Sequence, residues 1–228
     1  MLLALLAGLA LSSDVNKDVT CPNQSPHHIG FLKDQPDPQC FASPDGRNHI
    51  WVQQGHVQLN TAKHSFSMGV IDGGQIIWSP NSNGFVLANN EGSKDTELFS
   101  YFDLNSGKPR LINRLRQIGL SEFFKHYKCG GKDVNANSIT DGFTNEGKVR
   151  LVIQASVHSK GCQVSDDYMM IGLIGNPVTG QIDTVLKADE VRSQWCTPDQ
   201  KTHYGYCYDE AAFKEMLKAK PKTDKPKS

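Results

Sequence analysis

The sequence carries none of the short motifs that identify the common enzyme classes. It contains no G-x-S-x-G nucleophile elbow, no H-E-x-x-H zinc motif and no G-x-G-x-x-G dinucleotide loop. Segment 175–181 has the glycine spacing of a phosphate-binding P-loop, but Gln181 stands where that loop requires a lysine. We therefore interpret this segment as a hairpin turn and assign no catalytic residue.

The histidines, eight in number, do not have the spacing of a metal site. His27 and His28 are adjacent, and the side chains of neighbouring residues seldom converge on one ion. His49, His56 and His64 fall along expected strands, with no carboxylate at a metal-site interval. We expect structural or surface histidines, no metal ion and no cofactor.

Segment 133–141 partly matches an EF-hand calcium loop. Its oxygen donors at positions 1, 3, 5 and 9 are Asp133, Asn135, Asn137 and Asp141. Ser138 occupies the position that needs glycine, and Thr144 replaces the bidentate glutamate. We expect an Asn-rich connecting loop here, with calcium binding as the open alternative.

Aromatic residues gather around the last two cysteines. The small disulfide loop expected there carries one Trp and three Tyr: Trp195, Tyr204, Tyr206 and Tyr208. Aromatic side chains on a rigid loop are typical of recognition surfaces, because they offer a large contact area at low entropic cost. These four are the candidate binding residues; the alternative is that they pack under the loop as a satellite core.

The cysteines indicate a disulfide framework. They are six in number and include no C-x-x-C pair, which disfavours metal clusters and thioredoxin-like sites: Cys21, Cys40, Cys129, Cys162, Cys196 and Cys207. The simplest pairing joins sequence neighbours, namely Cys21–Cys40, Cys129–Cys162 and Cys196–Cys207, although other pairings remain open. Each bond would stabilise the fold by about 3 kcal/mol in an oxidising compartment.

The N-terminus predicts export. The apolar run 2–11 is shorter than the about 20 residues of a spanning helix, and it matches the core of a signal peptide covering 1–12. No cysteine follows the expected cleavage after Ser12, so a lipid anchor is not expected. We predict a soluble periplasmic or extracellular protein with no membrane span.

The overall charge argues against nucleic acid as a partner. The chain has 24 basic and 24 acidic residues, for a net charge of +0. A general nucleic-acid binder needs a basic surface for phosphate contacts. Only the end of the chain is biased, where lysine and proline alternate in a segment that we expect to be solvated.

Strand signals dominate the middle of the chain. Segments rich in β-branched and aromatic residues, bounded by turn residues, predict strands at 49–52, 56–59, 75–78, 84–88, 96–104, 149–155 and 168–174. A helical insertion is expected near 111–127, first over 111–118 with Gly119 as its C-terminal stop, then as a short turn capped by Ser121.

These signals divide the chain into four parts. We expect a signal peptide at 1–12, an irregular Pro-rich segment tied by a disulfide at 13–41, and a β-rich domain at 42–208. A helix capped by Asp209 and a Lys/Pro-rich tail complete the chain at 209–228.

One repeated pattern resembles a known family. Segment 78–88 begins Trp78-Ser79-Pro80-Asn81 and continues as an apolar strand, and segment 101–107 ends Asp103-Leu104-Asn105-Ser106-Gly107. An earlier copy begins at 42–46, and a weaker third copy spans 141–147 and 177–182. The first two copies start 36 positions apart, at 42 and 78. This pattern resembles the repeat of TolB-like and WD40-type β-propellers.

The resemblance implies blades of four antiparallel strands, which commonly act as interaction platforms. A closed propeller usually needs at least about four blades, and this chain has room for at most about three, one for each copy of the pattern. We therefore expect a mainly β protein with minor helices, whose antiparallel propeller-like sheets form an open or incomplete arrangement stapled by disulfides. A generic antiparallel protein that shares only turn chemistry is the alternative.

These features favour an exported, non-catalytic module that binds another protein, with an inhibitor or toxin-neutralising protein as one form of it. The alternative is an extracytoplasmic hydrolase or carbohydrate-active enzyme with an unfamiliar site. That site would join His126 or His158 to Asp141 or Asp166 in one cleft. A third hypothesis is an envelope-associated module whose Lys/Pro tail touches an anionic surface.

Overall fold

Three antiparallel sheets and two α-helices make up the part of the chain that the computed structural model describes, which is therefore mainly β. The described residues are 21, 27–29, 38–71, 73–90, 97–128, 136–155, 169–196 and 207. The expected signal peptide, the Cys129–Cys162 pair and the expected helix capped by Asp209 lie outside them. No helix among the described residues is long and apolar enough to cross a membrane.

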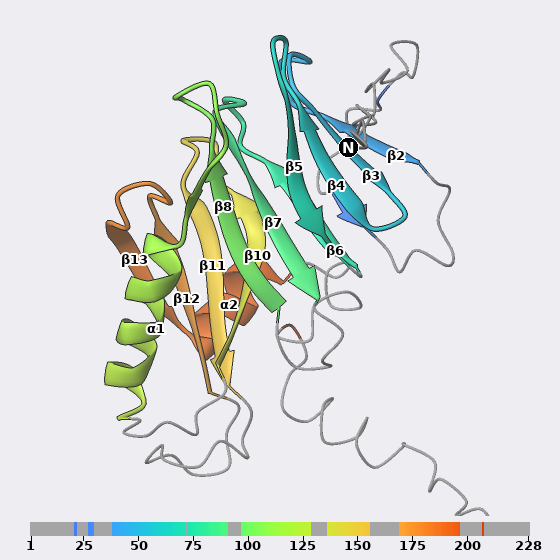
Figure 1. Cartoon of the computed structure of the whole chain (residues 1–228). Coiled ribbons are helices and arrows are strands. Elements are labelled where there is room, and N and C mark those ends of the chain that lie inside the picture. The colour runs from blue at the N-terminus through green and yellow to red at the C-terminus, as the bar shows by residue number, and fades with distance from the viewer. Residues whose placement is uncertain are drawn as a thin grey trace, which may run out of the picture.

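Each sheet contains four strands that follow one another in sequence (Figure 1). The N-terminal sheet consists of β2 (Gln39–Ala42), β3 (His49–Gln53), β4 (His56–Asn60) and β5 (Ser65–Val70). The central sheet consists of β6 (Gly74–Trp78), β7 (Gly84–Asn90), β8 (Glu97–Asp103) and β9 (Arg110–Ile112), with β1 (His27–Ile29) beside β6. The C-terminal sheet consists of β10 (Ala136–Phe143), β11 (Val149–Ala155), β12 (Met169–Gly175) and β13 (Ile182–Lys187).

Alternating side chains explain how the strands form and where they face. In the hairpin of β3 and β4, Ile50, Val52, Val57 and Leu59 are at most 1% exposed, while the residues between them are only partly covered. Gln54 and Gly55 both have positive φ, as in a primed hairpin turn. The hairpin expected from the sequence at this position is confirmed.

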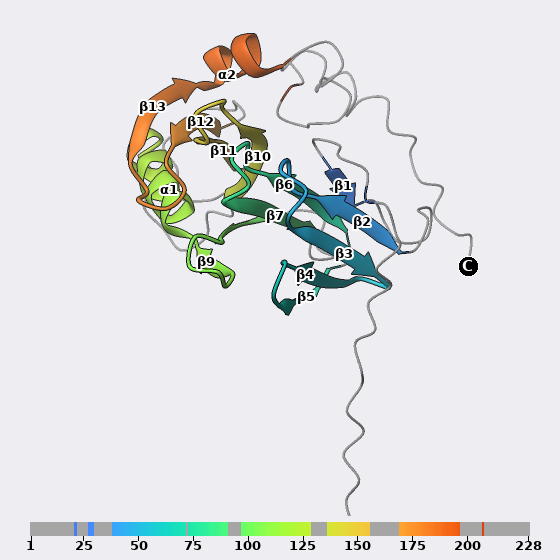
Figure 2. The same cartoon turned by 90° about the horizontal axis from the view of Figure 1, so that it is seen from above.

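The three sheets stack face to face, with the central sheet buried on both sides. One of its faces packs Ile76 and Phe85 against Ile50 and Leu59 of the N-terminal sheet. The opposite face packs Val86 and Tyr101 against residues of β11 and β12 in the C-terminal sheet. Figure 2, seen from above, shows the last strands β5, β9 and β13 along the outer side of this stack. No closed barrel or propeller is formed by the described residues.

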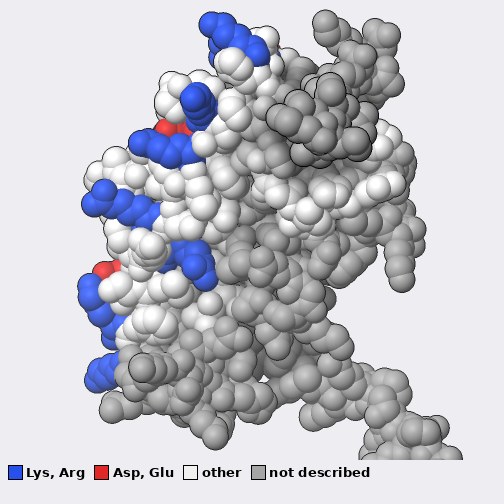
Figure 3. Space-filling view, in the orientation of Figure 1, with Lys and Arg blue, Asp and Glu red and all other residues white. Residues whose placement is uncertain are grey.

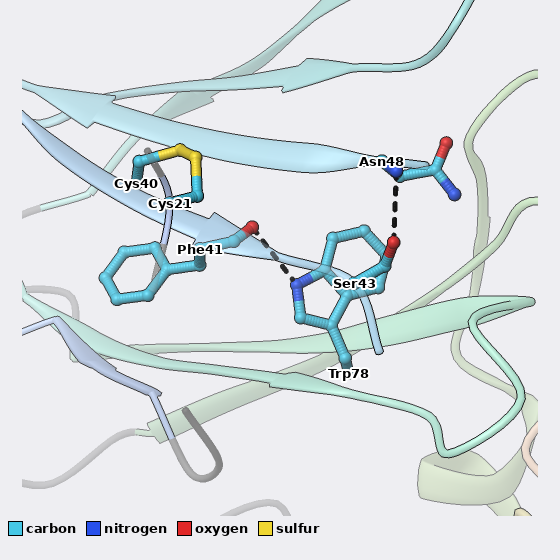
Figure 4. Close-up of a disulfide and its surroundings, with 6 residues drawn as sticks. All are labelled: Cys21, Cys40, Phe41, Ser43, Asn48 and Trp78. Carbon is cyan, nitrogen blue, oxygen red and sulfur yellow. Dashed lines mark hydrogen bonds between the residues drawn. A yellow bond between two sulfur atoms is a disulfide. The ribbon is translucent and has the colours of Figure 1, made fainter. Parts of the chain in front are cut away.

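A hydrogen bond and a disulfide accompany the packing between the first two sheets (Figure 4). The indole N–H of Trp78 on β6 donates to the carbonyl oxygen of Phe41 on β2, at 3.4 Å. The Trp78 ring also lies 5.1 Å from that of Phe85. Cys40, next to Phe41, is bonded to Cys21. The chain that precedes β2 is therefore attached to the N-terminal sheet.

Helix α1 (Arg114–His126) covers the inner face of the C-terminal sheet beside the central sheet. It runs without a break through Gly119, so the expected helix stop at this glycine is wrong. A Cβ on Gly119 would lie 2.6 Å from Cδ1 of Leu173 and 3.5 Å from Ile153. The glycine therefore permits the close approach of helix and sheet. The segment 110–112, expected to be helical in part, forms strand β9 instead.

Strand β10 replaces most of the expected Asn-rich loop. Residues 136–141 lie in this strand, which pairs with β11, so the expectation of a loop there is wrong. Asp133 and Asn135, the first two oxygen donors of the calcium alternative, lie outside the described residues, so calcium binding remains a prediction. The buried Ser138 hydroxyl accepts a hydrogen bond from Arg116, and the Thr140 hydroxyl donates to the Arg150 carbonyl.

Helix α2 (Ala188–Trp195) covers the outer face of the C-terminal sheet. Val191 and Trp195 pack on β12 where Gly172 leaves room, since a Cβ at that position would meet both side chains. A disulfide joins Cys196, directly after the helix, to the buried Cys207. Two of the three disulfides expected between sequence neighbours are thus present among the described residues.

Candidate functional site

The turn between the first and second strands has the same hydrogen bond in each of the three sheets. In each turn the backbone N–H of a hydroxyl residue donates to the carbonyl that closes the turn: Ser43 to Asn48 at 2.8 Å, Ser79 to Gly84 at 2.9 Å and Thr144 to Lys148 at 2.7 Å. These positions coincide with the three copies of the repeated sequence pattern. The turns therefore occupy equivalent places in the three sheets.

The hydroxyl group at the start of the turn also forms hydrogen bonds with later residues of the same turn. Ser43 Oγ accepts from the Asn48 N–H at 3.0 Å and donates to Asp45 Oδ1 at 2.7 Å. Ser79 Oγ accepts from the Gly84 N–H at 3.1 Å and donates to Asn81 Oδ1 at 2.8 Å. The Ser-Pro-Asp and Ser-Pro-Asn sequences thus build the same turn because Asp and Asn offer the same acceptor oxygen.

Asp45 is the most strongly shifted carboxylate of this region. Burial alone would raise its pKa, but hydrogen bonds from the Ser43 hydroxyl, the Arg47 backbone and the Arg47 guanidinium, with the charge of Arg47, lower the pKa to about 2. Arg47 Nε lies 2.6 Å from Asp45 Oδ2. The carboxylate is therefore a fixed part of the turn and not a proton donor near neutral pH.

Neighbouring turns are in direct contact. The backbone N–H of Asp45 donates to Ser82 Oγ at 3.1 Å, which connects the first turn to the second. Ser82 is 4% exposed and has a φ of 59°. An added Cβ on Gly147, in the third turn, would lie 3.6 Å from Nδ2 of Asn81 in the second. The three turns therefore lie side by side at one end of the stack.

The turn between β8 and β9 lies at the same end. Asp103, 2% exposed, accepts hydrogen bonds from the Asn105 amide at 2.7 Å and from Arg110 at 3.0 Å. It corresponds to the Asp of the repeated D-L-x-x-G pattern. Burial and the Asp103 charge together raise the pKa of the neighbouring Tyr101 to about 12, so this hydroxyl stays protonated.

A pocket of about 570 Å³ opens between four turns of the N-terminal and central sheets. Its lining comes from residues 47–48, 61–64, 82–83 and 104–108. Arg47, Lys63 and Lys108 contribute cations, and three asparagine amides lie among them: Asn48, Asn83 and Asn105. The hydroxyl groups of Thr61, Ser82 and Ser106 complete the polar lining. We refer to this cavity as the turn-end pocket.

The turn-end pocket is suited to binding. Among the lining residues that the structure describes there is no Asp, Glu or Cys, and His64 is the single imidazole. The cations and amides of this lining recognise carboxylates and peptide groups through hydrogen bonds.

Of the four candidate binding residues from the sequence, the structure describes Trp195. Trp195, the last residue of α2, is 5% exposed and packs on β12 with Val191 and Cys207, as in the satellite core that was the alternative for this loop. Tyr204, Tyr206 and Tyr208 lie outside the described residues, so the recognition surface remains a prediction.

The groups expected for a metal or hydrolytic site are not brought together in the described part of the chain. No three His, Cys, Asp or Glu side chains among the described residues are grouped to hold a metal ion. His126 is exposed at the end of α1, while His158 and Asp166 lie outside the described residues. His49 and His56 lie on strands of the N-terminal sheet and are not among the described lining residues of the turn-end pocket.

Sequence reasoning missed Arg47, Lys63 and Lys108. The net charge of the whole chain hides local differences, and these three residues are far apart in sequence. A count over short windows would have found part of the signal, since segment 104–128 contains six Lys and Arg and one Glu.

No family model matches this sequence, and no curated protein matches it significantly.

Proposed function

We propose that this chain is an exported, non-catalytic binding module that engages another protein through the turn-end pocket and the turns around it. The single observation that carries the proposal is the convergence of four turns from two sheets around one polar, cation-lined cavity. Loops held by a rigid β scaffold are common recognition surfaces. An inhibitor or toxin-neutralising protein is one form that such a module can take.

We further propose that the sheets are propeller-like blades in an incomplete arrangement, related to the TolB-like and WD40-type repeat. Three sheets, each containing four strands that are consecutive in sequence, stack face to face with equivalent first turns and support this interpretation. In such an arrangement the turns of neighbouring blades share one end, which accounts for the pocket between two sheets.

Export is the part of the proposal that concerns location. The apolar run 2–11 and the two disulfides among the described residues support it, since disulfides persist in oxidising compartments. A partner protein would then be met in the periplasm or outside the cell.

The test is affinity capture from the exported fraction, using the purified chain and two pocket variants. Ala62→Trp places a large side chain in the pocket, and Lys63→Glu reverses a lining charge; both residues are exposed in the turn between β4 and β5. A partner captured by the wild type should be lost or weakened at least about tenfold in both variants.

Lys187→Glu is the matched control, because it reverses an exposed lysine that does not line the pocket. It should retain the partner. Absence of any specific partner, or a partner retained equally by the pocket variants and the control, would overturn the proposal.

A further inference from the structure

One segment of the chain is rich in basic side chains. Segment 104–128 contains six Lys and Arg residues but a single acidic residue, Glu122. Figure 3 shows Lys and Arg in a broken column down the left side, with acidic groups at only two places. The six are Lys108, Arg110, Arg114, Arg116, Lys125 and Lys128, and we refer to them as the basic stripe.

Four of the six residues of the basic stripe have no acidic partner among the described residues. Arg110 pairs with Asp103, Lys125 pairs with Glu122, and Arg116 donates to Ser138. Lys108, Arg114 and Lys128 are exposed, and no described carboxylate lies within ion-pair distance of them. Their charges are therefore available to an external anion.

Two cations of the basic stripe do not stabilise helix α1. Arg114 and Arg116 occupy the first turn of α1, which holds no acidic residue. The positive end of the helix dipole lies there, so cations at this position oppose helix formation. The stem of Arg114 lies against Gly180 in the turn between β12 and β13, which fixes its position beside the sheets.

Strand β9 lies between the turn-end pocket and α1, at the outer edge of the central sheet. It pairs with β8 on one side only, with Arg110 opposite Asp103 and Leu111 opposite Phe102. Leu111 is 52% exposed and is one of three large hydrophobic side chains exposed in the described chain. Because side chains alternate along a strand, Arg110 and Leu111 face opposite sides of the sheet.

From this arrangement we infer that β9 and the basic stripe bind an extended segment of a partner protein in which acidic and apolar residues alternate. The segment adds a strand beside β9, so that its main chain meets the free edge. Its acidic side chains then face Arg114, and its apolar side chains face Leu111. Continuing past the turn, it reaches Lys108 and the turn-end pocket.

The exposed Leu111 favours an acidic peptide over other polyanions as the ligand of this surface. A sulfated polysaccharide or an anionic membrane surface would also be attracted by the cations. Neither supplies a row of main-chain groups for a strand edge together with an apolar side chain for Leu111. Protein interfaces combine such an apolar contact with a polar rim. The inference rests on the proposed function, because it names the chemistry of the protein that the module binds.

The experiment is fluorescence anisotropy with labelled synthetic peptides of about ten residues, the length of a long strand. The first peptide alternates glutamate and valine. The second has the same composition with its glutamates and valines in two blocks, and the third has glutamine in place of glutamate. The alternating peptide should bind at least about tenfold more tightly than either control, and its affinity should fall as salt rises.

Two variants of the chain locate the binding. Arg114→Glu should weaken the alternating peptide at least about fivefold, and Leu111→Ser should weaken it about fivefold to tenfold. The matched controls are Lys187→Glu, an exposed lysine outside the stripe, and Val185→Ser, a valine 48% exposed on the edge strand β13. Both controls should change the affinity by less than about twofold. Circular dichroism of each variant reports folding independently.

Three results would overturn the inference. These are equal binding of the alternating and block peptides, equal effects of Leu111→Ser and Val185→Ser, and tighter binding to heparin or to phosphatidylserine vesicles than to the alternating peptide. The proposed function is judged separately by the captured partner. If that partner depends on Ala62→Trp but not on Arg114→Glu or Leu111→Ser, the module binds protein and only the alternating segment is wrong.

Discussion

Single residues at the turn end stabilise the turns and also determine the charge of the turn-end pocket. Asp45 accepts hydrogen bonds from Ser43 and Arg47, and its own N–H donates to Ser82 in the neighbouring turn. Arg47 therefore has two roles, since it pairs with Asp45 and also lines the turn-end pocket. A change at Asp45 should alter the pocket as well as the turn.

Asp45 gives a prediction about stability and pH. Its pKa is about 2 in the folded protein, below the ordinary value of 3.8, so its ionised form favours folding. This contribution, which solvent screening reduces because Asp45 is an exposed residue, is complete above pH 3.8 and is lost as the pH falls through about 2. Urea unfolding of wild type and Asp45→Asn should therefore differ most at neutral pH. The difference in unfolding free energy should shrink between about pH 4 and pH 2.

A difference that stays constant over this pH range would contradict the structural role of the carboxylate. Because other carboxylates titrate in both proteins, only the difference between the two proteins is interpreted.

The residues of the turn-end pocket could not be predicted from the sequence, for a physical reason. Lys63 and Lys108 belong to turns of different sheets and meet only because the sheets stack. By contrast, the Ser-Pro-Asp and Ser-Pro-Asn turns were visible in the sequence, since their hydrogen bonds are local. Trp195 was visible as an aromatic residue, but its burial depends on Gly172, which lies in a distant strand.

At the scale of whole elements, α1 shows how tertiary packing overrides a local signal. Gly119 has the residue type of a helix stop, yet the helix continues because its close contact with β12 requires a glycine. Strand β10 is a second case, since its Asn-rich sequence is typical of a loop and its pairing with β11 makes it a strand. The strands of the hairpins were predicted because their alternation is local.

The packing of Gly119 can be measured with a double-mutant cycle. Gly119→Ala gains about 1 kcal/mol of helix propensity but places a Cβ 2.6 Å from Leu173 Cδ1, so it should be destabilising in the wild type. In a Leu173→Ala background the space is open, and the same change should stabilise the protein by up to about 1 kcal/mol. Urea unfolding of the four proteins provides the coupling energy.

The same effect of Gly119→Ala in both backgrounds would show that the glycine is not held by this contact. Leu173→Ala itself should cost about 2–5 kcal/mol, because Leu173 is fully buried.

At the scale of the whole molecule, the stack of three sheets leaves one end to the turns. The helices α1 and α2 cover the C-terminal sheet, and the Cys21–Cys40 disulfide attaches the preceding chain to the N-terminal sheet. The turn-end pocket and the basic stripe remain open on the described surface. The number of sheets could be anticipated from the repeated pattern, but their stacking order depends on contacts distant in sequence.

The most direct test of the account is hydrogen–deuterium exchange of the chain with and without its captured partner. Binding at the turn end should slow exchange of the backbone amides at 47–48, 61–64, 82–83 and 104–108, which line one pocket although they are separate in sequence. Helix α2 and strand β13 should exchange at the same rate in both samples. Slower exchange at α2 and β13, with no change in the four turns, would contradict the account.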